Sequence, residues 1–206
     1  MVIGIDASRA NHEEKTGVEW YAWHLIEEFK KIIPDTHRVI LYSDEPLRGA
    51  LSVLPAHWES RVLRWPPRRL WTQVRLSYEM LVRRPDVLFI PAHVCPIIHP
   101  DRTVMTVHDI AAVQFPETYS RFEHWYSLSS ARYAVKRLWR VIVPSEHVKK
   151  QLLAFVQHDV STPHNIVVIH HGFDRRYLTP ISESAVAVAR EKYEIRGIVS
   201  ETKDCR

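Results

Sequence analysis

The sequence predicts an α/β protein whose core is a Rossmann-like, doubly wound parallel sheet. Short aliphatic runs rich in β-branched residues recur along the 206 residues. Polar loops and stretches of helical period separate these runs, and strands that alternate with helices indicate a parallel sheet covered on both faces. The runs are almost continuously aliphatic, as is typical of strands buried on both sides.

The first strand and the first helix are the best defined elements. Residues 2–6 (VIGID) form the strand, and residues 17–33 follow with a helical period. Thr16 and Glu19 have the spacing of a capping box that starts this helix, and Pro34 ends it. One face of the helix is apolar and is expected to meet the sheet; it comprises Val18, Ala22, Leu25, Phe29 and Ile32.

The remaining elements continue the alternation. Further strands are expected at 38–43, 60–64, 86–90, 103–107, 140–143 and 165–169, and helices at about 68–83, 118–138, 145–157 and 183–193. The helix over 68–83 carries an apolar stripe that is expected to face the core, namely Trp71, Val74, Tyr78 and Leu81. The domain is therefore expected to occupy residues 1–178, with a linker and tail over 179–206.

Composition and charge narrow the class of protein. Hydrophobic residues make up 46% and charged residues 25%, as in an ordinary globular domain. Cys95 and Cys205 are far apart and show no pairing pattern, so a reducing, cytoplasmic compartment is expected. No cysteine–histidine spacing suits a structural zinc ion. The amino terminus has no signal-peptide pattern, and no run approaches the roughly 18–20 apolar residues of a membrane-spanning helix. A formal charge of +4 permits anionic ligands or peripheral contact with an anionic membrane.

Polar side chains crowd the predicted carboxyl edge of the sheet, where open parallel sheets bind their ligands. Four of them follow the ends of three strands: Asp6, Arg9, His93 and Glu146. His108 and Asp109 directly follow the strand expected over 103–107. His108 could donate a hydrogen bond to a sugar hydroxyl or a phosphate, with Asp109 orienting it. The alternative is an edge histidine beside a helix-capping aspartate.

Two helix starts are candidates for binding phosphate. Gly17 opens the first helix and Ser145 precedes a later one, and backbone N–H groups at such positions can bind an anion. Loop geometry at Gly17 and simple N-capping by Ser145 are the alternatives. With five glycines the chain has no GxGxxG or Walker A motif, which excludes a classical dinucleotide site and a P-loop NTPase. His170 and His171 lack a third ligand, so no metal is expected.

Residues 61–84 contain seven arginines and one acidic residue, interleaved with aromatic residues. Such a helix can dock on an anionic lipid surface or on nucleic acid. The alternative is a solvated basic face. No nucleic-acid-binding signature is present, so anionic lipid is the expected partner, attracted through Arg64, Arg68, Arg69 and Arg75.

Six segments resemble, in the correct order, the amino-terminal domain of retaining GT-B glycosyltransferases of group one, or family four, especially mannosyltransferase-like members. The resemblance covers about residues 2–178. The segments are IGIDASRA, KTGVEWYAWHLIEEF, RRLWTQVRLSYEMLVRRPDVLFIPAHVCP, TVHDIAAVQFPETYS, IVPSEHVKKQL and IVVIHHGFD, the last with His171 in place of the family's usual Asn.

The resemblance implies one half of a GT-B fold, which binds the acceptor and closes over a nucleotide-sugar donor held mainly by a carboxyl-terminal domain. Gly17 and Ser145 would lie near the donor phosphates. His108 would contact the transferred sugar, with Asp109 supporting its loop. On the acceptor side the candidates are Asp6, Arg9, His93 and Glu146. No cofactor or metal is implied, because the nucleotide sugar is a substrate and basic residues of the second domain balance its diphosphate.

Two classes of function follow from the resemblance. One is a hexosyltransferase, with mannose as the favoured sugar and a glycan or lipid-linked acceptor. The other is a non-catalytic remnant or binding subunit that a separate carboxyl-terminal domain completes. Because the resemblance ends before the second domain, the 206-residue chain is expected to be inactive alone.

Overall fold

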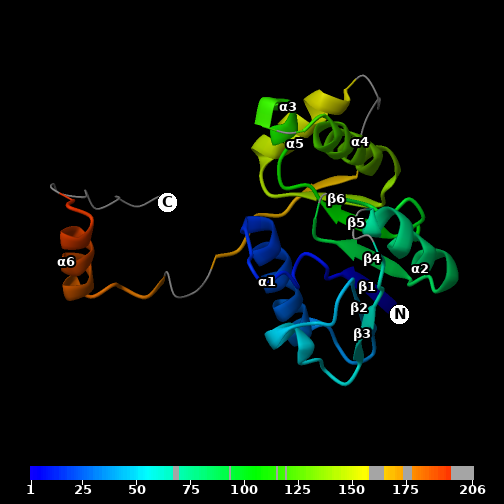
Figure 1. Ribbon diagram of the computed structural model, residues 1–206, viewed down its shortest axis with the longest axis horizontal. Helices are drawn as coiled ribbons and strands as arrows, with labels where there is room; N and C mark the ends of the chain where they lie inside the picture. Colours follow the sequence, from blue (N-terminus) through cyan, green and yellow to red (C-terminus); the bar gives the residue numbers. More distant parts are fainter. Residues whose placement is uncertain are drawn as a thin grey trace. The chain divides into compact units, whose positions relative to one another are not determined.

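A computed structural model describes residues 1–66, 70–92, 94–114, 116–118, 120–157, 165–173 and 178–195. The chain divides into two compact units, Met1–His171 and Gly172–Arg206. The first unit contains the whole sheet and all the candidate site residues. Figure 1 shows its helices arranged around the central strands.

A seven-stranded, fully parallel sheet forms the centre of the first unit. Its strands are β1 (Val2–Asp6), β2 (Arg38–Ser43), β3 (Trp58–Val62), β4 (Val87–Ile90), β5 (Thr103–Thr106), β6 (Arg140–Val143) and β7 (Ile166–Val168). Their order is β3-β2-β1-β4-β5-β6-β7. The direction of winding therefore reverses between β1 and β4, which confirms the predicted doubly wound Rossmann-like sheet.

Helices cover both faces, and successive strand residues point to opposite layers. Val39 and Leu41 of β2 join the apolar cluster under α1 (Gly17–Ile32) and the short 3₁₀ turn η1 (Gly49–Ser52). Ile40 and Tyr42 join the cluster on the other face. The helices on that face are α2 (Ser77–Val82), α4 (Arg121–Arg137) and α5 (Glu146–Val156). The near-continuous aliphatic strands are thus explained by burial on two sides.

The predicted helix ends are confirmed for α1 and α5. Glu19 accepts a hydrogen bond from the backbone N–H of Thr16 at 3.1 Å, completing the capping box. The Oγ of Ser145 accepts one from the N–H of Val148 at 3.2 Å. The inward face predicted for α1 is partly wrong, because Ile32 is exposed and Ile26 is fully buried instead. The buried face of α1 is therefore rotated slightly about the helix axis relative to the predicted face.

The apolar stripe predicted to face the core between residues 68 and 83 is wrong for three of its four residues. Trp71 is buried, and its Nε1 donates to the carbonyl of Leu63 at 2.6 Å. Val74, Tyr78 and Leu81 are 40%, 58% and 65% exposed, and Leu76 and Met80 are buried in their place.

A π-helical turn explains this rotation. Residues Thr72–Leu76 form the π-helix η2, which leads directly into α2. A π turn closes hydrogen bonds from i to i+5, so it adds a residue to the turn and rotates the rest of the helix about its axis. The buried positions accordingly run from 71 to 76 and then to 80, spacings of five and four that a uniform α-helical period does not predict.

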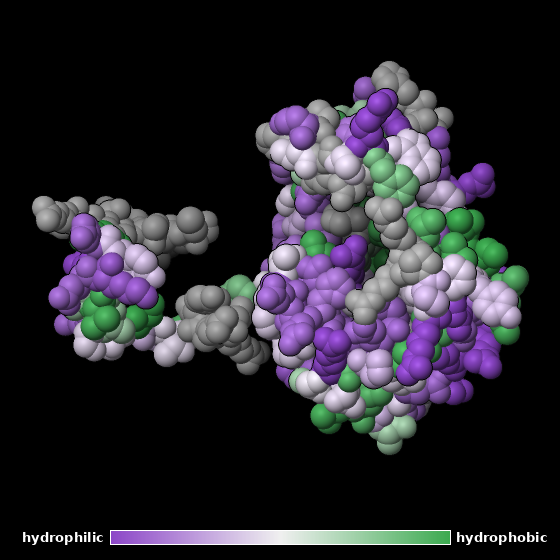
Figure 2. All heavy atoms as spheres, viewed as in Figure 1, coloured by the Kyte–Doolittle hydropathy of each residue, from purple (hydrophilic) through white to green (hydrophobic). Residues whose placement is uncertain are grey.

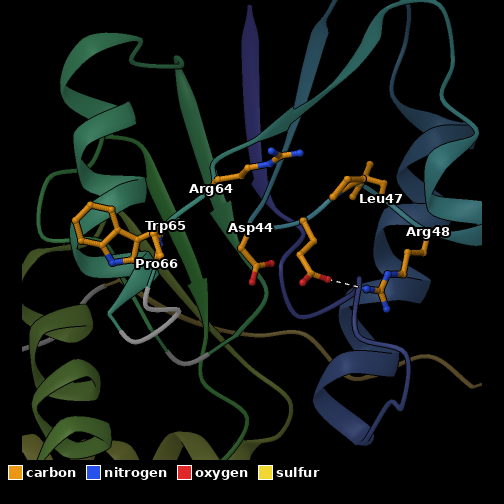
Figure 3. Close-up of a pocket in the computed structure, with 8 residues that line it drawn as sticks. Asp44, Leu47, Arg48, Arg64, Trp65 and Pro66 are labelled. Carbon is orange, nitrogen blue, oxygen red and sulfur yellow. Dashed lines mark hydrogen bonds and ion pairs between the residues drawn. The ribbon is translucent and has the colours of Figure 1, made fainter.

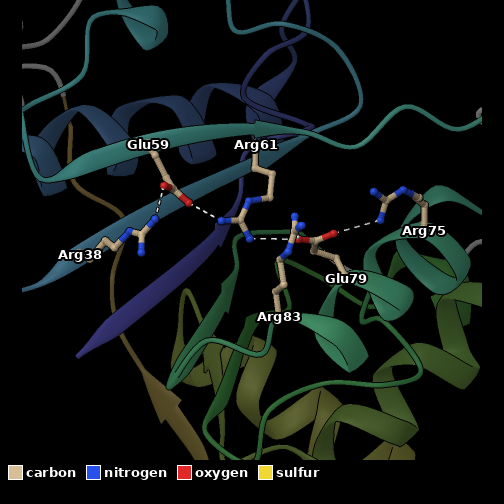
Figure 4. Close-up of polar contacts among 6 residues, drawn as sticks. All are labelled: Arg38, Glu59, Arg61, Arg75, Glu79 and Arg83. Atoms are coloured by element: carbon tan, nitrogen blue, oxygen red, sulfur yellow. Dashed lines mark hydrogen bonds and ion pairs between the residues drawn. The ribbon is translucent and has the colours of Figure 1, made fainter.

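A buried carboxylate ties α2 to the sheet (Figure 4). The side chain of Glu79 is 4% exposed. Its carboxylate forms ion pairs with the guanidinium groups of Arg61 at 3.0 Å, Arg75 at 3.3 Å and Arg83 at 3.7 Å. Arg61 of β3 also pairs with Glu59, which in turn pairs with Arg38 of β2. Burial acts to lower the pKa of Arg61, but hydrogen bonds and charges from Glu79 and Glu59 raise it overall. Three of the seven arginines in residues 61–84 therefore form ion pairs with Glu79 that hold α2 against the sheet.

Smaller elements complete the chain. The single-turn helix α3 (Ala111–Gln114) and the 3₁₀ turn η3 (Pro116–Thr118) follow β5. The second unit contains α6 (Glu183–Lys192), which Ser182 caps and which confirms the predicted last helix. None of its residues is buried. In the part of the chain that the structure describes, no helix has the length and apolarity needed to cross a membrane.

Candidate functional site

An aromatic and histidine cluster lies at the carboxyl edge of the sheet. Tyr21 reaches it from the second turn of α1, and its hydroxyl lies 3.2 Å from the Oγ1 of Thr106 at the end of β5. The Tyr21 ring centroid is 4.6 Å from the rings of both His108 and His171. The two histidine rings are 5.4 Å apart. Residues that follow β1, β5 and β7 therefore meet at one place, as expected for a ligand site of a doubly wound sheet.

His108 is held in one orientation by the backbone. Its Nε2 lies 2.8 Å from the carbonyl oxygen of Pro91, which follows β4. Because a carbonyl can only accept, Nε2 carries the proton, and Nδ1 of the neutral ring can only accept a hydrogen bond. Burial lowers the pKa of His108, and the neighbouring His171 lowers it further. The neutral ring is therefore the form present near pH 7, so His108 is better suited to accept from a sugar hydroxyl than to donate to it.

Asp109 lies beside this cluster, and its side chain contacts the backbone. Its Oδ1 accepts a hydrogen bond from the N–H of Ala111 at 2.9 Å, at the start of α3. The side chain is exposed. This contact fixes the loop that follows His108.

The start of α1 is open to an approaching group. A Cβ atom placed on Gly17 would meet no heavy atom within 4 Å. Two residues later, Glu19 lies 3.6 Å from Arg9. Burial acts to raise the pKa of Glu19, but hydrogen bonds from Thr16 and the charge of Arg9 hold it below its usual value. The positive charge of Arg9 therefore offsets the negative charge of Glu19, which would otherwise repel an anion at the start of α1.

The other predicted site residues are distributed along the same edge. Asp6 is buried and accepts from the N–H of Ser8 at 3.0 Å and from its hydroxyl at 2.6 Å; burial raises its pKa, which these two bonds oppose. Ser145 caps α5, and Glu146 is the exposed first residue of that helix. His93 lies outside the described residues. Within the described ranges, no three His, Cys, Asp or Glu side chains are placed to hold a metal ion.

A second feature of this edge is an open hollow after β2 and β3 (Figure 3). Its volume is about 790 Å³. Asp44, Glu45 and Arg48 of the loop after β2 form one part of its lining, and Arg64 and Trp65 of the segment after β3 form another. The hollow has the size of a small-molecule site and combines charged groups with an aromatic ring.

Comparison with known proteins identifies the family. Residues 15–177 match the model of Glycosyltransferase Family 4. The chain belongs to this family.

A solved structure has the same kind of fold. The chain is similar to HepE (Alr3699) of Anabaena, solved in complex with UDP-glucose, with a TM-score of 0.55 and 19% sequence identity. The match covers 94% of this chain and 49% of HepE, so the family 4 chain spans about half the length of that relative. This likeness confirms the fold predicted from the sequence. No functionally curated protein matches the sequence.

The sequence did not predict three features that this family 4 domain has at the carboxyl edge of its sheet, namely Tyr21, the contact of His171 and the hollow. Tyr21 lies in the second turn of a helix, where a tyrosine gives no functional signal, and only the fold brings it to His108. His171 gives no metal-ligand pattern, although its position after a strand already places it at the edge. The hollow could not be predicted, because its lining comes from two loops separated by a whole strand.

Proposed function

We propose that the chain is the amino-terminal, acceptor-side part of a retaining glycosyltransferase that transfers a hexose from a nucleotide sugar to a glycan or lipid-linked acceptor. The meeting of Tyr21, His108 and His171 beside the open start of α1 carries the proposal. Membership of family 4 supports the transferase class. The complex of HepE with UDP-glucose supports a nucleotide sugar as the donor.

Each part of the cluster has a task in this proposal. The backbone N–H groups that begin at Gly17 approach the donor phosphates, and the missing side chain gives them room. Neutral His108 accepts a hydrogen bond from a hydroxyl of the transferred sugar, while Tyr21 and the Pro91 carbonyl hold its ring. Asp109 fixes the loop, and Ser145 holds the start of α5 near the phosphates. As the nucleoside diphosphate departs, donors fixed in advance stabilise the leaving charge without a metal.

The donor sugar and the completeness of the enzyme are part of the same proposal. Mannose, donated by GDP-mannose, is the first hexose to test, and glucose, donated by UDP-glucose, is the second. The proposal places the active protein in the cytoplasm and requires a carboxyl-terminal domain for turnover. The alternative function is a non-catalytic binding subunit, which would bind a sugar without transferring it.

Titration calorimetry and transfer assays test the proposal. Two proteins are compared, the 206-residue chain and the same chain joined to a family 4 carboxyl-terminal domain. We expect the joined protein to bind and turn over one nucleotide hexose and the chain alone to show no turnover. Turnover by the chain alone would contradict the need for a second domain. Donor binding without turnover by the joined protein would contradict the transferase and leave the binding subunit.

We also propose that α2 contacts an anionic membrane surface peripherally. The exposed residues Val74, Tyr78 and Leu81 form a stripe along η2 and α2, and Ile97 and Ile98 lie beside it. The backbone N–H of Ile97 donates to the Oγ of Ser77 at 2.9 Å, which joins that loop to the helix. Figure 2 shows apolar side chains gathered over this region. Contiguous exposed apolar patches commonly mark interaction sites.

Charge favours an anionic surface as the partner of this patch. The ion-pair network of α2 contains four arginines and two glutamates, and is therefore net positive. Of the four arginines expected to attract lipid, Arg64 is exposed and Arg75 lies over the Tyr78 ring at 5.7 Å. Arg68 and Arg69 lie outside the described residues. A basic rim around an apolar stripe fits the interface of an anionic bilayer.

Vesicle flotation tests the membrane contact. We expect binding to vesicles that contain phosphatidylglycerol, weaker binding in high salt, and loss of binding in a Tyr78→Ser, Leu81→Ser double variant. Val53→Ser is the control, because Val53 is at least as exposed and follows η1, which packs in a different apolar cluster from α2. Equal binding to neutral vesicles, or dimers in sedimentation that the double variant abolishes, would contradict the proposal.

A further inference from the structure

His171 has a fixed place at the carboxyl edge, although it follows the last strand of the sheet. The backbone N–H of Ile169 donates to the carbonyl of Val143 at 3.0 Å, which continues the pairing of β7 with β6 beyond the end of β7. The chain then needs two residues to bring the next imidazole to the rings of Tyr21 and His108. The position of His171 in the cluster is therefore set by the sheet.

The two histidines of the cluster differ in their surroundings. The ring of His108 is half-buried, and its Nε2 faces the carbonyl oxygen of Pro91 at 2.8 Å. His171 is exposed, and within the described residues neither of its ring nitrogens has a hydrogen-bond partner. Solvent therefore reaches both nitrogens of His171, and this ring can take up a proton or bind a ligand without breaking a bond in the protein.

Tyr21 provides a surface that favours the protonated form of His171. The two ring centroids are 4.6 Å apart and the ring planes are tilted by 35°, so the imidazole lies over a face of the phenol ring. An aromatic face attracts a cation at such a distance. Burial raises the pKa of Tyr21, so its hydroxyl stays uncharged. Tyr21 therefore holds an imidazolium by stacking and does not neutralise its charge.

The charged and titratable groups around the two histidines allow the pair to take up one proton. The rings of His108 and His171 are 5.4 Å apart, so a charge on one opposes a charge on the other. Burial lowers the pKa of both rings, but the exposed ring keeps more of its hydration and therefore takes the proton first. The carboxylates of Asp109 and Glu19 act on His108, and Glu19 is paired with Arg9.

A protonated His171 would supply hydrogen bonds that neutral His108 cannot give. The Nδ1 of neutral His108 only accepts, which suits a sugar hydroxyl but not a phosphate. An imidazolium has two N–H donors and a positive charge, and charge-assisted hydrogen bonds are about twice as strong as neutral ones. Gly17 lies one turn before Tyr21 on α1, and helical side chains lean towards the amino terminus. The stacked rings therefore lie on the side from which the proposed donor phosphates approach.

We infer that His171 binds the diphosphate of the donor as an imidazolium, so that donor binding is coupled to the uptake of a proton. The inference rests on the proposed function for the identity of the ligand as a nucleotide sugar. The proton comes from solvent and stays on the ring while the phosphate is bound. Because an anion beside the imidazole raises its pKa, donor binding tightens as the pH falls through the titration range of His171.

NMR of the 206-residue chain with ¹⁵N-labelled histidine tests the inference, because ring nitrogen signals report protonation and detect weak binding. The probes are GDP-mannose and UDP-glucose, whose diester phosphates stay ionised over the pH range used. We expect at least one of them to bind about fivefold or more tightly at about pH 5.5 than at about pH 8. At about pH 6.5 the same donor should move the signals of His171 towards the protonated form.

Two variants identify the group that takes up the proton. His171→Asn should make donor binding independent of pH, because an amide keeps an N–H donor but gains no charge. His170→Asn is the matched control. His170 is also exposed and follows β7, and its Nδ1 lies 3.0 Å from the carbonyl oxygen of Pro144, a hydrogen bond that an asparagine amide can keep. This control should retain the pH dependence.

Three results would overturn the inference. They are equal donor affinity at both pH values, a pH dependence that persists in His171→Asn, and no donor binding at about pH 5.5. The second result would assign the proton to another group, such as His108.

The outcome is separable from that of the proposed function. Proton-coupled donor binding that His171→Asn abolishes, in a chain that never transfers a hexose even when joined to a second domain, would keep His171 as a binding residue and remove the transferase. Transfer by the joined protein, together with donor binding that does not depend on pH, would remove the role of His171 and keep the transferase.

Discussion

Gly17→Ala separates a role in donor binding from a role in folding. A Cβ at this position meets nothing within 4 Å, and the glycine does not have a left-handed backbone. The added methyl group therefore costs no contact in the protein itself. Replacing a glycine at a compatible position stabilises a protein by about 0.4–1 kcal/mol, mainly by restricting the unfolded chain. For a domain of this size that corresponds to a rise in Tm of roughly 1–4 °C.

The same methyl group lies where the proposed donor phosphates approach. In the protein joined to a second domain we expect donor affinity to fall at least about tenfold, or 1.4 kcal/mol. Stability and function should therefore change in opposite directions. Calorimetric unfolding and donor titration on one preparation measure both quantities.

Gly4→Ala is the control for the folding measurement. A Cβ at Gly4 would lie 2.7 Å from Cε2 of Tyr42 and 3.0 Å from Cγ of Pro85, inside the sheet. Overpacking of this kind costs about 1–3 kcal/mol, so this variant should unfold at a lower temperature. A Gly17→Ala protein that is destabilised to a similar extent would refute the open environment of Gly17. Unchanged donor affinity would refute its role beside the phosphates.

Three further predictions concern the histidine cluster and the core. In the joined protein, His108→Ala should reduce turnover more than donor binding, by about 1.5–3 kcal/mol if it holds a group that gains charge in the transition state; parallel losses of turnover and Tm would indicate a structural role instead. Because burial lowers the folded-state pKa of His108 and His171 below their unfolded value of about 6.5, the unfolded chain binds protons first on acidification. Stability should therefore fall as the pH decreases through 6.5, and less so in a His108→Gln, His171→Gln variant; an identical pH profile for both proteins would contradict this. Trp71→Phe removes the hydrogen bond to the carbonyl of Leu63 and should cost about 1–3 kcal/mol in urea unfolding, while a cost near zero would show that water replaces it.

The sequence alone determined the order of strands and helices and hence the class of fold. Aliphatic runs, the capping box of Thr16 and Glu19, and the N-cap of Ser145 are local signals that depend on residues a few positions apart. The carboxyl edge was predictable for the same reason, because every strand of a parallel sheet points the same way. The positions of His108, Asp109 and Gly17 relative to the strands were therefore enough to assign them to that edge.

Only the tertiary structure decided which side chains meet there and which face of α2 is buried. Tyr21 contacts His108 across a separation of more than eighty residues, and the hollow joins Asp44 to Trp65 from different strands. The π turn at Thr72–Leu76 reversed the expected orientation of Tyr78 and Leu81, because one added residue in a turn rotates every later side chain. Periodicity measures spacing along the chain, whereas contacts depend on how packed elements approach one another in space.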